Sequence, residues 1–337
     1  MSHLLSNLSI DMAHAIPKFR YLSAWFCPYA HRATLALEHH AGAIEYEWVE
    51  ALGWEQRKGR LEVHLRASHL RTQANGFNCS LDEKNVTGTG KEWWYHWKVS
   101  FSANGPPVAF AALNPWSRQA PELIRANPSG LVPTLIPIED GKVLEERSVY
   151  ESLITIDFVD SVANSLDEQR RLVPSDPYIA SKCRYWAEKV NRECCSPYYG
   201  VLVKTDEEGQ KESFDQLVSG LKAFSRELEK NGDARGFLGG GRLTNTDFSL
   251  APWAYRYYIF ENYRGYGIPK DDDELAAYHV WHDHIFSVES VKRTLPDKER
   301  YLEHIGKYAD SSARSKVANA VRRGVSAHEI DDEKDTY

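Results

Sequence analysis

The sequence predicts an N-terminal α/β domain followed by an all-helical domain. Three observations support this fold class. A strand, a helix and a strand open the chain, two more strands and a helix follow a long irregular stretch, and no convincing strand occurs beyond about residue 178. With 337 residues, 42% of them hydrophobic and 26% charged, the chain is long enough for two ordinary globular domains.

The opening unit is expected between residues 19 and 49. A strand is expected at 19–24. A helix is expected from Pro28 to about His40, because proline is favoured at the first helical position and small and apolar residues follow it. Residues 44–49, "IEYEWV", alternate apolar and polar side chains as a half-buried strand does.

The second group of elements begins near residue 131. Strands are expected at 131–138 and 142–146, with a helix at 148–162. The polar, proline-containing stretch 163–177 is typical of a linker. Beyond it, apolar residues at helical spacing predict helices in the segments 178–195, 212–232, 247–263 and 272–287.

Two further signals concern the helical half. Thr244 and Asp247 have the spacing of a capping box, so a helix is expected to begin at Thr244. From Ser312 the chain passes from a basic to an acidic stretch, which favours a surface helix followed by disorder.

In residues 51–115 the apolar residues follow neither helical nor strand spacing, and this stretch is expected to form an insertion that is mostly irregular. We leave open a lid built from Trp93, Trp94 and Trp97, and a gene-model artefact such as a translated intron. The domain boundaries expected are 1–18 for an N-terminal extension, 19–162 for the α/β domain including the insertion, 163–177 for the linker, 178–311 for the helical domain and 312–337 for a surface helix and charged tail.

Composition excludes several classes of function. The net charge of -7 and the lack of an extended basic run argue against nucleic acid as a partner. No run approaches the roughly 18 apolar residues of a membrane helix, and the polar N-terminus lacks a secretory signal, so we expect a cytoplasmic protein without a membrane partner. The five cysteines form no C-x-x-C pair and His279, His282 and His284 have no metal-site signature, so neither disulfides nor a metal is expected.

Cys27 is the strongest candidate for chemistry. It lies between an expected strand and the first turn of an expected helix, where unpaired backbone N–H groups and the helix dipole favour a thiolate. Because the thiolate is the nucleophile, Cys27 is a candidate for covalent sulfur chemistry. The alternative is an inert buried cysteine, which is our interpretation of Cys79, Cys183, Cys194 and Cys195.

Several motifs in order resemble a cytosolic glutathione transferase. They are Cys-Pro-Tyr-Ala after a strand, "NPSGLVPTL" at 127–135, "YES" at 150–152 and the Thr-x-x-Asp box of the helical domain. Cysteine in place of serine or tyrosine makes the chain similar to the omega class, particularly its fungal members. The resemblance covers about 19–50 and 118–310. It implies a thioredoxin-like N-terminal domain, an all-α C-terminal domain and a homodimer.

The resemblance also implies a glutathione site. Val132 would pair with the cysteinyl part of glutathione beside a cis Pro133. Ser152 would bind the γ-glutamyl carboxylate and Glu151 its amino group. From the residues alone, Pro133 could equally initiate a strand, and Ser152 and Glu151 could simply cap a helix.

One position departs from the family. The lysine that usually precedes the Asn-Pro-x-Gly motif and contacts glutathione is absent. Arg118 or Gln119 stands there, depending on a one-residue gap, and we assign Gln119.

The acceptor pocket of this fold lies between the domains. Aromatic residues of the helical domain would suit a flat, hydrophobic acceptor, although aromatics at helical spacing are more often core. The candidates are Trp253, Tyr257 and Tyr185, with Trp186, Tyr198, Tyr199 and Tyr258 in the same aromatic group.

The resemblance therefore predicts a glutathione-dependent thioltransferase or dehydroascorbate reductase that works through a Cys27–glutathione mixed disulfide. Ala30 replaces the second cysteine of a dithiol protein, so a second glutathione would release the intermediate. Two alternatives stay open: a glutathione-conjugating transferase for a small electrophile, including one of secondary metabolism, and a non-catalytic binding or regulatory protein.

Overall fold

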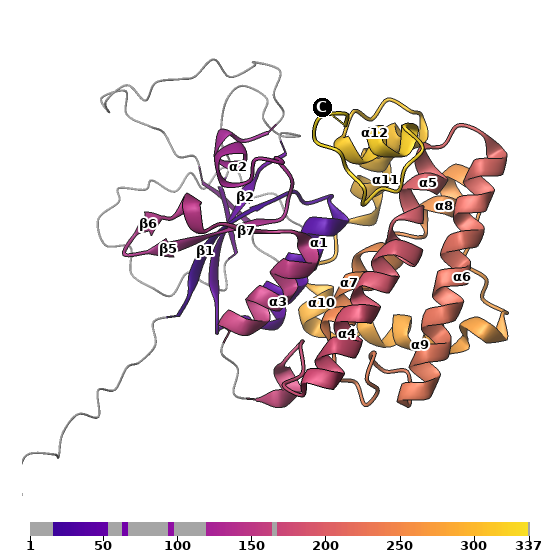
Figure 1. The fold of residues 1–337 in the computed structure, drawn as a ribbon, viewed down its shortest axis with the longest axis horizontal. Helices are drawn as coiled ribbons and strands as arrows, with labels where there is room; N and C mark the ends of the chain where they lie inside the picture. Colours follow the sequence, from indigo (N-terminus) through magenta and orange to yellow (C-terminus); the bar gives the residue numbers. More distant parts are fainter. Residues whose placement is uncertain (1–15, 53–62, 67–93, 98–118, 164–166, 336–337) are drawn as a thin grey trace, which may run out of the picture.

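The computed structural model describes residues 16–52, 63–66, 94–97, 119–163 and 167–335. A sheet with flanking helices lies beside a bundle of helices, and α1 and α3 lie between the two (Figure 1). The fold class predicted from the sequence, a thioredoxin-like domain followed by an all-helical domain, is confirmed.

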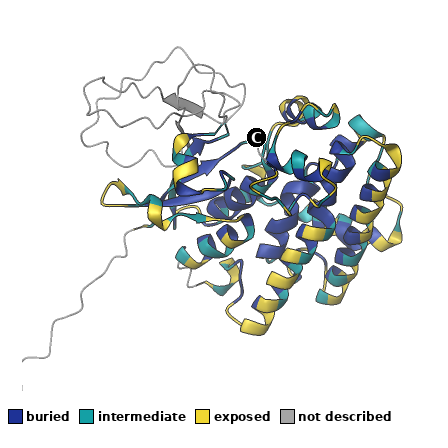
Figure 2. Ribbon diagram, turned by 45° about the horizontal axis from the view of Figure 1, so that its top comes forward, coloured by how far each residue is buried: buried dark blue, intermediate teal, exposed yellow. Residues whose placement is uncertain are grey.

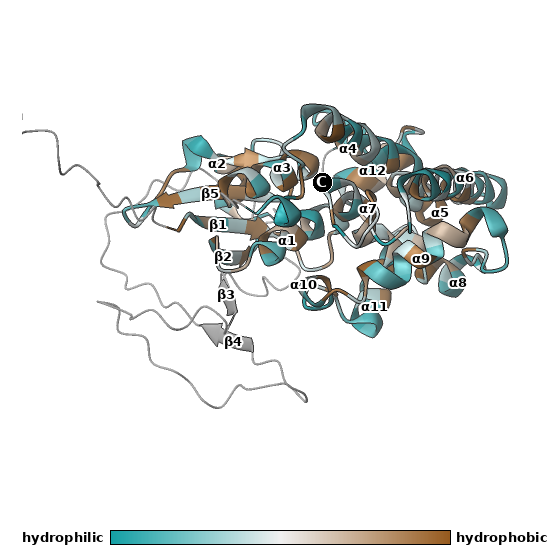
Figure 3. Ribbon diagram, turned by 90° about the horizontal axis from the view of Figure 1, so that it is seen from below, coloured by the Kyte–Doolittle hydropathy of each residue, from teal (hydrophilic) through white to brown (hydrophobic). Residues whose placement is uncertain are grey.

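The strands form one sheet in the order β4-β3-β2-β1-β5-β6, with β7 pairing with β5. β1 runs parallel to β2 and antiparallel to β5, and Figure 3 shows β5, β1, β2, β3 and β4 following one another across the sheet. The strands are β1 (Lys18–Ser23), β2 (Glu45–Glu50), β3 (Val63–Arg66), β4 (Trp94–Trp97), β5 (Thr134–Glu139), β6 (Lys142–Val143) and β7 (Val149–Tyr150).

Successive side chains of β1 point to opposite faces of the sheet, so core residues lie on both faces. Tyr21 joins a core cluster with residues of α1 and α3, whereas Leu22 joins a second cluster with residues of α2. Figure 2 shows the central strands and the inner faces of the helices as buried. The first helix of this domain, α1, therefore lies against the helical domain with its N-terminus at the domain boundary.

The helices fall largely where apolar spacing predicts them. Four of them, α1, α2, α4 and α5, carry proline in the first turn, where the missing N–H costs no hydrogen bond. They are α1 (Pro28–His39), α2 (Pro121–Ala126), α3 (Ser152–Val162), α4 (Pro177–Val190), α5 (Pro197–Val203), α6 (Glu207–Asn231), α7 (Asn245–Ala254), α8 (Ile259–Arg264), α9 (Ala276–Ile285), α10 (Glu289–Lys292), α11 (Lys298–Ala309) and α12 (Lys316–Arg322), with 3₁₀ turns at Glu145–Arg147, Glu168–Arg170 and Asp273–Leu275 and a π-helical turn at Asn191–Cys195.

Some predicted bounds are wrong for local reasons. The strand expected at 131–138 begins only at Thr134, because Pro133 has no N–H to donate to the sheet. The helix expected at 148–162 begins at Ser152, since Val149 and Tyr150 pair with β5. The helix expected at 247–263 divides into α7 and α8, and α7 contains Pro252.

The insertion is not irregular throughout. β3 and β4 lie within it and extend the sheet beyond β2 as antiparallel neighbours. The remainder of 51–115 beyond Leu52 lies outside the described residues, as do Trp93 and the N-terminal extension up to residue 15. The lid and the gene-model artefact therefore stay untested predictions.

The C-terminal tail differs from the disorder expected for it. After α12 the chain is described through Asp335, which is buried and forms an ion pair with Arg323 at 2.6 Å. The end of the chain lies between the two domains (Figure 1). Paired charges within the tail thus hold it against the molecule, which composition alone did not indicate.

The capping box is confirmed and is more extensive than its spacing suggested. Asp247 is fully buried and accepts hydrogen bonds from the Thr244 N–H at 2.7 Å and the Thr244 hydroxyl at 2.8 Å. It also accepts from the Phe237 N–H and from the indole Nε1–H of Trp281. Asp247 therefore joins the start of α7 to α9 and to the preceding loop.

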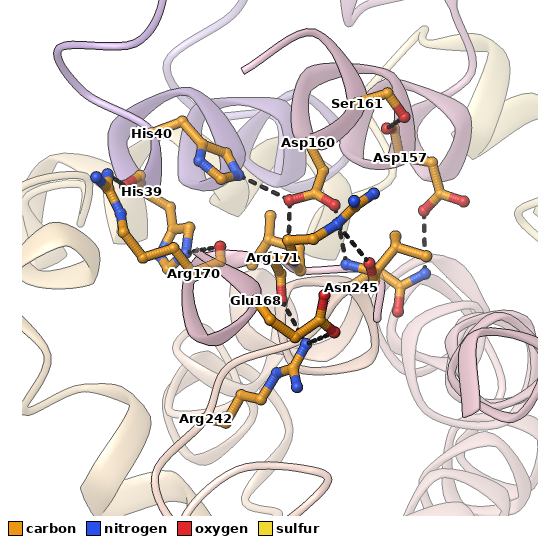
Figure 4. A network of polar contacts seen from close by, with 12 residues as sticks. His39, His40, Asp157, Asp160, Ser161, Glu168, Arg170, Arg171, Arg242 and Asn245 are labelled. Atoms are coloured by element: carbon orange, nitrogen blue, oxygen red, sulfur yellow. Dashed lines mark hydrogen bonds and ion pairs between the residues drawn. The ribbon is translucent and has the colours of Figure 1, made fainter. Parts of the chain in front are cut away.

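A buried polar network fastens the linker to the thioredoxin-like domain (Figure 4). His40, at the end of α1, contacts Asp160 of α3 through Nε2 and Oδ1 at 2.9 Å, and neither side chain is exposed by more than 1%. Asp160 also accepts from the backbone N–H groups of Leu172 and Val173. One carboxylate thus holds two helices and the linker in register.

Candidate active site

A cleft of about 800 Å³ lies between the two domains. One wall comes from the start of α1, the loop before β5 and the start of α3, and the other from α4, α5, α11 and the C-terminal tail. All six residues that the sequence assigned to catalysis and glutathione binding line it: Cys27, Gln119, Val132, Pro133, Glu151 and Ser152.

Cys27 is the N-cap residue of α1 and is half-buried at the floor of the cleft. Burial raises the pKa of the Cys27 thiol above its ordinary value, while hydrogen bonds from the backbone N–H groups of Ala30 and Tyr29 lower it in part. The helix start therefore acts in the expected direction, but burial outweighs it.

The backbone before β5 presents an extended edge to the cleft. The Val132–Pro133 peptide is cis, as the resemblance implied, and both residues line the cleft. Asn127 stabilises this loop, because its side-chain amide donates to the Leu131 carbonyl at 2.9 Å and to the Thr134 hydroxyl at 3.3 Å. The Val132 backbone is thereby held in place for an extended peptide.

Glu151 and Ser152 lie side by side at the start of α3. Glu151 has φ of 71° and ψ of 116°, a conformation that residues with a side chain rarely adopt. Ser152 is buried, and its hydroxyl accepts a hydrogen bond from Arg32 Nη1 at 3.0 Å. The Glu151 side chain makes no capping hydrogen bond, so helix capping does not account for this backbone conformation.

Gln119 lies at the other end of the cleft. Its side-chain amide donates to the Gly130 carbonyl at 2.6 Å, and its backbone forms an isolated bridge with Leu52. Arg118, the alternative candidate, lies outside the described residues. The amide of Gln119 is thus already used to hold the loop that contains Gly130.

The three residues proposed for the acceptor pocket do not line the cleft. Trp253 is fully buried and packs against Arg32, with the guanidinium carbon 4.3 Å from the ring centre. Tyr257 is buried too, and its hydroxyl donates to the Cys194 carbonyl. Tyr185 points to solvent on the outer side of α4 and is 60% exposed. Helical spacing identified the core of the domain, not the pocket.

Other residues complete the lining of the cleft. Of the aromatic group considered from the sequence, Tyr199 lines it. Apart from Phe26, which precedes α1, the rest come from α11 and from residues 312–330, where a surface helix followed by disorder was predicted and α12 confirms the helix. The principal ones are Phe26, Tyr301, Ile305, Lys307, Tyr308, Arg314, Lys316, Val317, Ala327, His328 and Ile330.

Two polar residues of the cleft were also missed. Arg32 is buried and donates to the Ser249 carbonyl as well as to Ser152 and, at 3.4 Å, to the Cys195 sulfur. Asn191 lies in the π-helical turn after α4, is 7% exposed, and its Oδ1 has no hydrogen-bond partner. Arg32 follows the Cys-Pro-Tyr-Ala motif closely, which is a signal, but no sequence pattern indicates a π turn.

Comparison with known proteins shows what this chain is similar to. The family profile described as glutathione S-transferase, C-terminal domain, matches residues 207–284. Glutathione S-transferase U26 of Arabidopsis thaliana is 26% identical over 209 residues, which cover 62% of this chain and 86% of the relative. These matches make the chain similar to glutathione S-transferases, most clearly in its helical half. Glutathione transferase GST 23 of Zea mays is 26% identical over 187 residues, covering 55% of this chain and 77% of the relative.

Solved glutathione S-transferase structures share the fold. Omega 3C from Trametes versicolor has a TM-score of 0.56 and 22% identity, covering 88% of this chain and 92% of that one. Rice GST1, solved in complex with glutathione, has a TM-score of 0.57 and 18% identity, covering 89% and 99%. Among the residues that the structure describes, no helix has the length and apolarity to cross a membrane.

Proposed function

We propose that this protein is a member of the glutathione S-transferase family, a glutathione-dependent thioltransferase of omega type that works through a Cys27–glutathione mixed disulfide. The observation that carries the proposal is the position of Cys27, which lies in one cleft with Val132 and Ser152. Glutathione would pair with the Val132 backbone, its γ-glutamyl carboxylate would meet Ser152 at the start of α3, and its amino group would meet Glu151. Its sulfur would then lie over Cys27.

The chemistry is thiol–disulfide exchange. The Cys27 thiolate attacks the glutathionyl sulfur of a mixed disulfide, the S–S bond breaks, and the acceptor leaves as a thiolate while the Cys27–glutathione disulfide forms. The thiolate of a second glutathione then attacks that disulfide, which yields oxidised glutathione and returns the Cys27 thiolate. Dehydroascorbate reduction at the same thiol is the related activity that we include.

The second step requires glutathione, because the described part of the cleft offers no resolving thiol. Ala30 stands where a dithiol protein has its second cysteine. Cys195 is buried behind Arg32, and its pKa is raised to about 12 by burial. We therefore propose a one-thiol mechanism.

A conjugating transferase is the second candidate, and the raised pKa of Cys27 favours it. Tyr29 lines the same cleft, and its buried hydroxyl has no hydrogen-bond partner. A tyrosine hydroxyl can donate to the thiolate of glutathione itself, which would then attack an electrophile without Cys27.

The variant Cys27→Ala separates these candidates. We expect it to lose glutathione-dependent reduction of 2-hydroxyethyl disulfide, because the mixed disulfide can no longer form. Two results would contradict the thioltransferase proposal and favour conjugation. One is reduction of 2-hydroxyethyl disulfide that persists in the variant. The other is turnover of 1-chloro-2,4-dinitrobenzene, without turnover of the disulfide, by both wild type and variant. Glutathione binding by calorimetry without turnover of either substrate would favour a non-catalytic protein.

The compartment, the oligomeric state and the substrates follow from the same proposal. We propose a cytoplasmic homodimer whose co-substrate is glutathione and whose acceptor is a small disulfide or aromatic compound. The four cysteines that the structure describes are free thiols, which suits a reducing compartment. Sedimentation of the full chain tests the dimer.

A further inference from the structure

Arg256 is a fully buried arginine without a buried counter-ion. It follows α7 and has no exposed surface, and among the described residues no carboxylate lies within ion-pair distance of it. Its Nη1 donates to the Pro252 carbonyl at 2.6 Å, whereas Nε and Nη2 have no hydrogen-bond partner. An unpaired buried charge destabilises a fold, so its presence in the core calls for a role.

The guanidinium is joined to the first turns of α1 through His31. Arg256 Nη1 lies 3.0 Å from His31 Nδ1, so this ring nitrogen accepts. A neutral ring then carries its hydrogen on Nε2, which lies 2.8 Å from the Thr294 hydroxyl, and that hydroxyl donates to the Val291 carbonyl. The backbone N–H of His31 in turn donates to the Cys27 carbonyl at 2.9 Å.

Tyr301 separates the same guanidinium from the cleft. The guanidinium carbon lies 4.7 Å from the centre of the Tyr301 ring, and the Tyr301 hydroxyl contacts the Tyr198 hydroxyl at 2.8 Å. Tyr301 and Cys27 both line the cleft. The positive charge therefore lies against a residue of the cleft wall, in the buried interior, where its field is weakly screened.

The groups that face Cys27 come from every element packed around it. Hydrogen bonds from Ala30 and Tyr29 and the charge of Arg256 lower its pKa, whereas burial and the charge of Glu50 raise it. The titratable and charged groups that interact with the thiol are Tyr21 and Glu50 from the sheet, Tyr29 from α1, Tyr199 from α5, Arg256 after α7 and Tyr301 from α11.

We propose that Arg256 is a positioning residue that supplies the missing counter-charge to the Cys27 thiolate from behind the cleft wall. The charge of Arg256 meets an opposite charge at Cys27 only when Cys27 loses its proton. This role rests on the proposed thiol chemistry, because it concerns the reactive state of Cys27. It offsets part of the effect that burial has on the thiol.

The test is the pH dependence of Cys27 alkylation by iodoacetamide in the full-length protein, followed on the Cys27 peptide by mass spectrometry. In Arg256→Gln, we expect the midpoint to move up by about one pH unit, so that alkylation at pH 7 slows about tenfold. Arg256→Lys keeps the charge and should restore the wild-type profile.

Arg264 provides the matched control. It is partly buried, donates to the carbonyls of Val201, Leu202 and Ala309, and does not line the cleft. Arg264→Gln should leave the alkylation midpoint unchanged, even where thermal stability falls.

If Arg256→Gln folds and its alkylation profile is the same as that of wild type, the proposal is overturned. An equal shift of the alkylation midpoint in Arg264→Gln would also overturn it. If Arg256→Gln does not fold, the profile of Arg256→Lys decides, and a midpoint displaced from the wild type overturns it. Because alkylation requires neither glutathione nor turnover, these results are independent of whether the proposed transferase activity holds.

Discussion

Arg32 Nη1 donates a hydrogen bond to the Ser152 hydroxyl at 3.0 Å and so connects the helix that carries the thiol to the helix that would hold the γ-glutamyl end of glutathione. The same guanidinium is fixed by the Ser249 carbonyl and by the face of Trp253. The two halves of the proposed glutathione site are thereby kept at a constant separation.

This geometry predicts that Arg32→Lys weakens glutathione binding. Lysine keeps the charge but cannot make the three directed contacts of the guanidinium, so Ser152 loses its orientation. We expect the glutathione KM to rise about tenfold, the equivalent of about 1.4 kcal/mol, with a smaller change in kcat. Arg20→Lys, on the same domain with its partners Glu47 and Glu122 outside the cleft, is the control and should leave KM unchanged.

Asn191 offers a free acceptor to the ligand. Its buried Oδ1 faces the cleft without a partner, so the bound amino group of glutathione is a suitable donor. Asn191→Leu should weaken glutathione binding about fivefold, the equivalent of about 1 kcal/mol, without lowering the melting temperature, because no protein hydrogen bond is lost. Calorimetric titration measures the affinity. Unchanged affinity with reduced stability would mean that Asn191 only packs the π turn.

Lys316 bridges the tail and the thioredoxin-like domain. Its Nζ donates to the Ser129 carbonyl at 2.8 Å and pairs with Asp332 at 2.6 Å. In Lys316→Met we expect faster hydrogen exchange over residues 312–335 and a several-fold higher KM for the acceptor, because the tail forms that side of the cleft. Lys334→Met removes an exposed pair with Asp331 in the same tail and should change neither quantity.

The Asp160 network predicts sensitivity to acid. Burial alone would raise the pKa of Asp160, but hydrogen bonds from His40, Leu172 and Val173 outweigh it and lower the pKa below its ordinary value. A carboxyl group whose pKa is lower in the folded state stabilises the protein above its unfolded-state pKa of about 4, and this contribution is lost as the pH falls through the folded pKa.

Asp160→Asn should therefore reduce the free energy of unfolding by about 3 kcal/mol at pH 7. The deficit relative to wild type should begin to shrink below about pH 4, where the unfolded-state carboxyl takes up a proton, and should go on shrinking as the pH falls through the lower pKa of the folded state. Thermal melts between pH 3 and 8 measure this. Asp157→Asn is the matched control in Figure 4: it pairs with Arg184 at the surface and should cost less at every pH. A deficit that does not change with pH would rule out the charge as its cause.

The residues predicted for the thiol side of the cleft do line it, because each of them carries a local signal in the sequence. Cys27, the Val132–Pro133 pair and the Glu151–Ser152 pair each sit where a strand or loop meets a helix, and such junctions leave local signals in proline and in capping residues. The acceptor side could not be predicted in this way. It is assembled by the return of residues 312–332 across the molecule, a long-range contact without a periodic pattern.

The misassigned aromatics show the same limit. Trp253 and Tyr257 have the spacing of a helix face, and that face is buried against α1 and the π turn rather than open to the cleft. Periodicity predicts that a helix face is buried, but it does not predict which element packs against that face. The net direction of the Cys27 pKa shift could not be predicted for a related reason, because the helix start is local whereas burial depends on the whole fold.

The claim that Cys27 carries glutathione as a mixed disulfide is tested most directly by peptide mass spectrometry after incubation with oxidised glutathione. The account predicts one glutathione on the Cys27 peptide, none on the peptides of Cys183, Cys194 and Cys195, and its removal by reduced glutathione. An unmodified Cys27 in a protein that still reduces 2-hydroxyethyl disulfide with glutathione would contradict it.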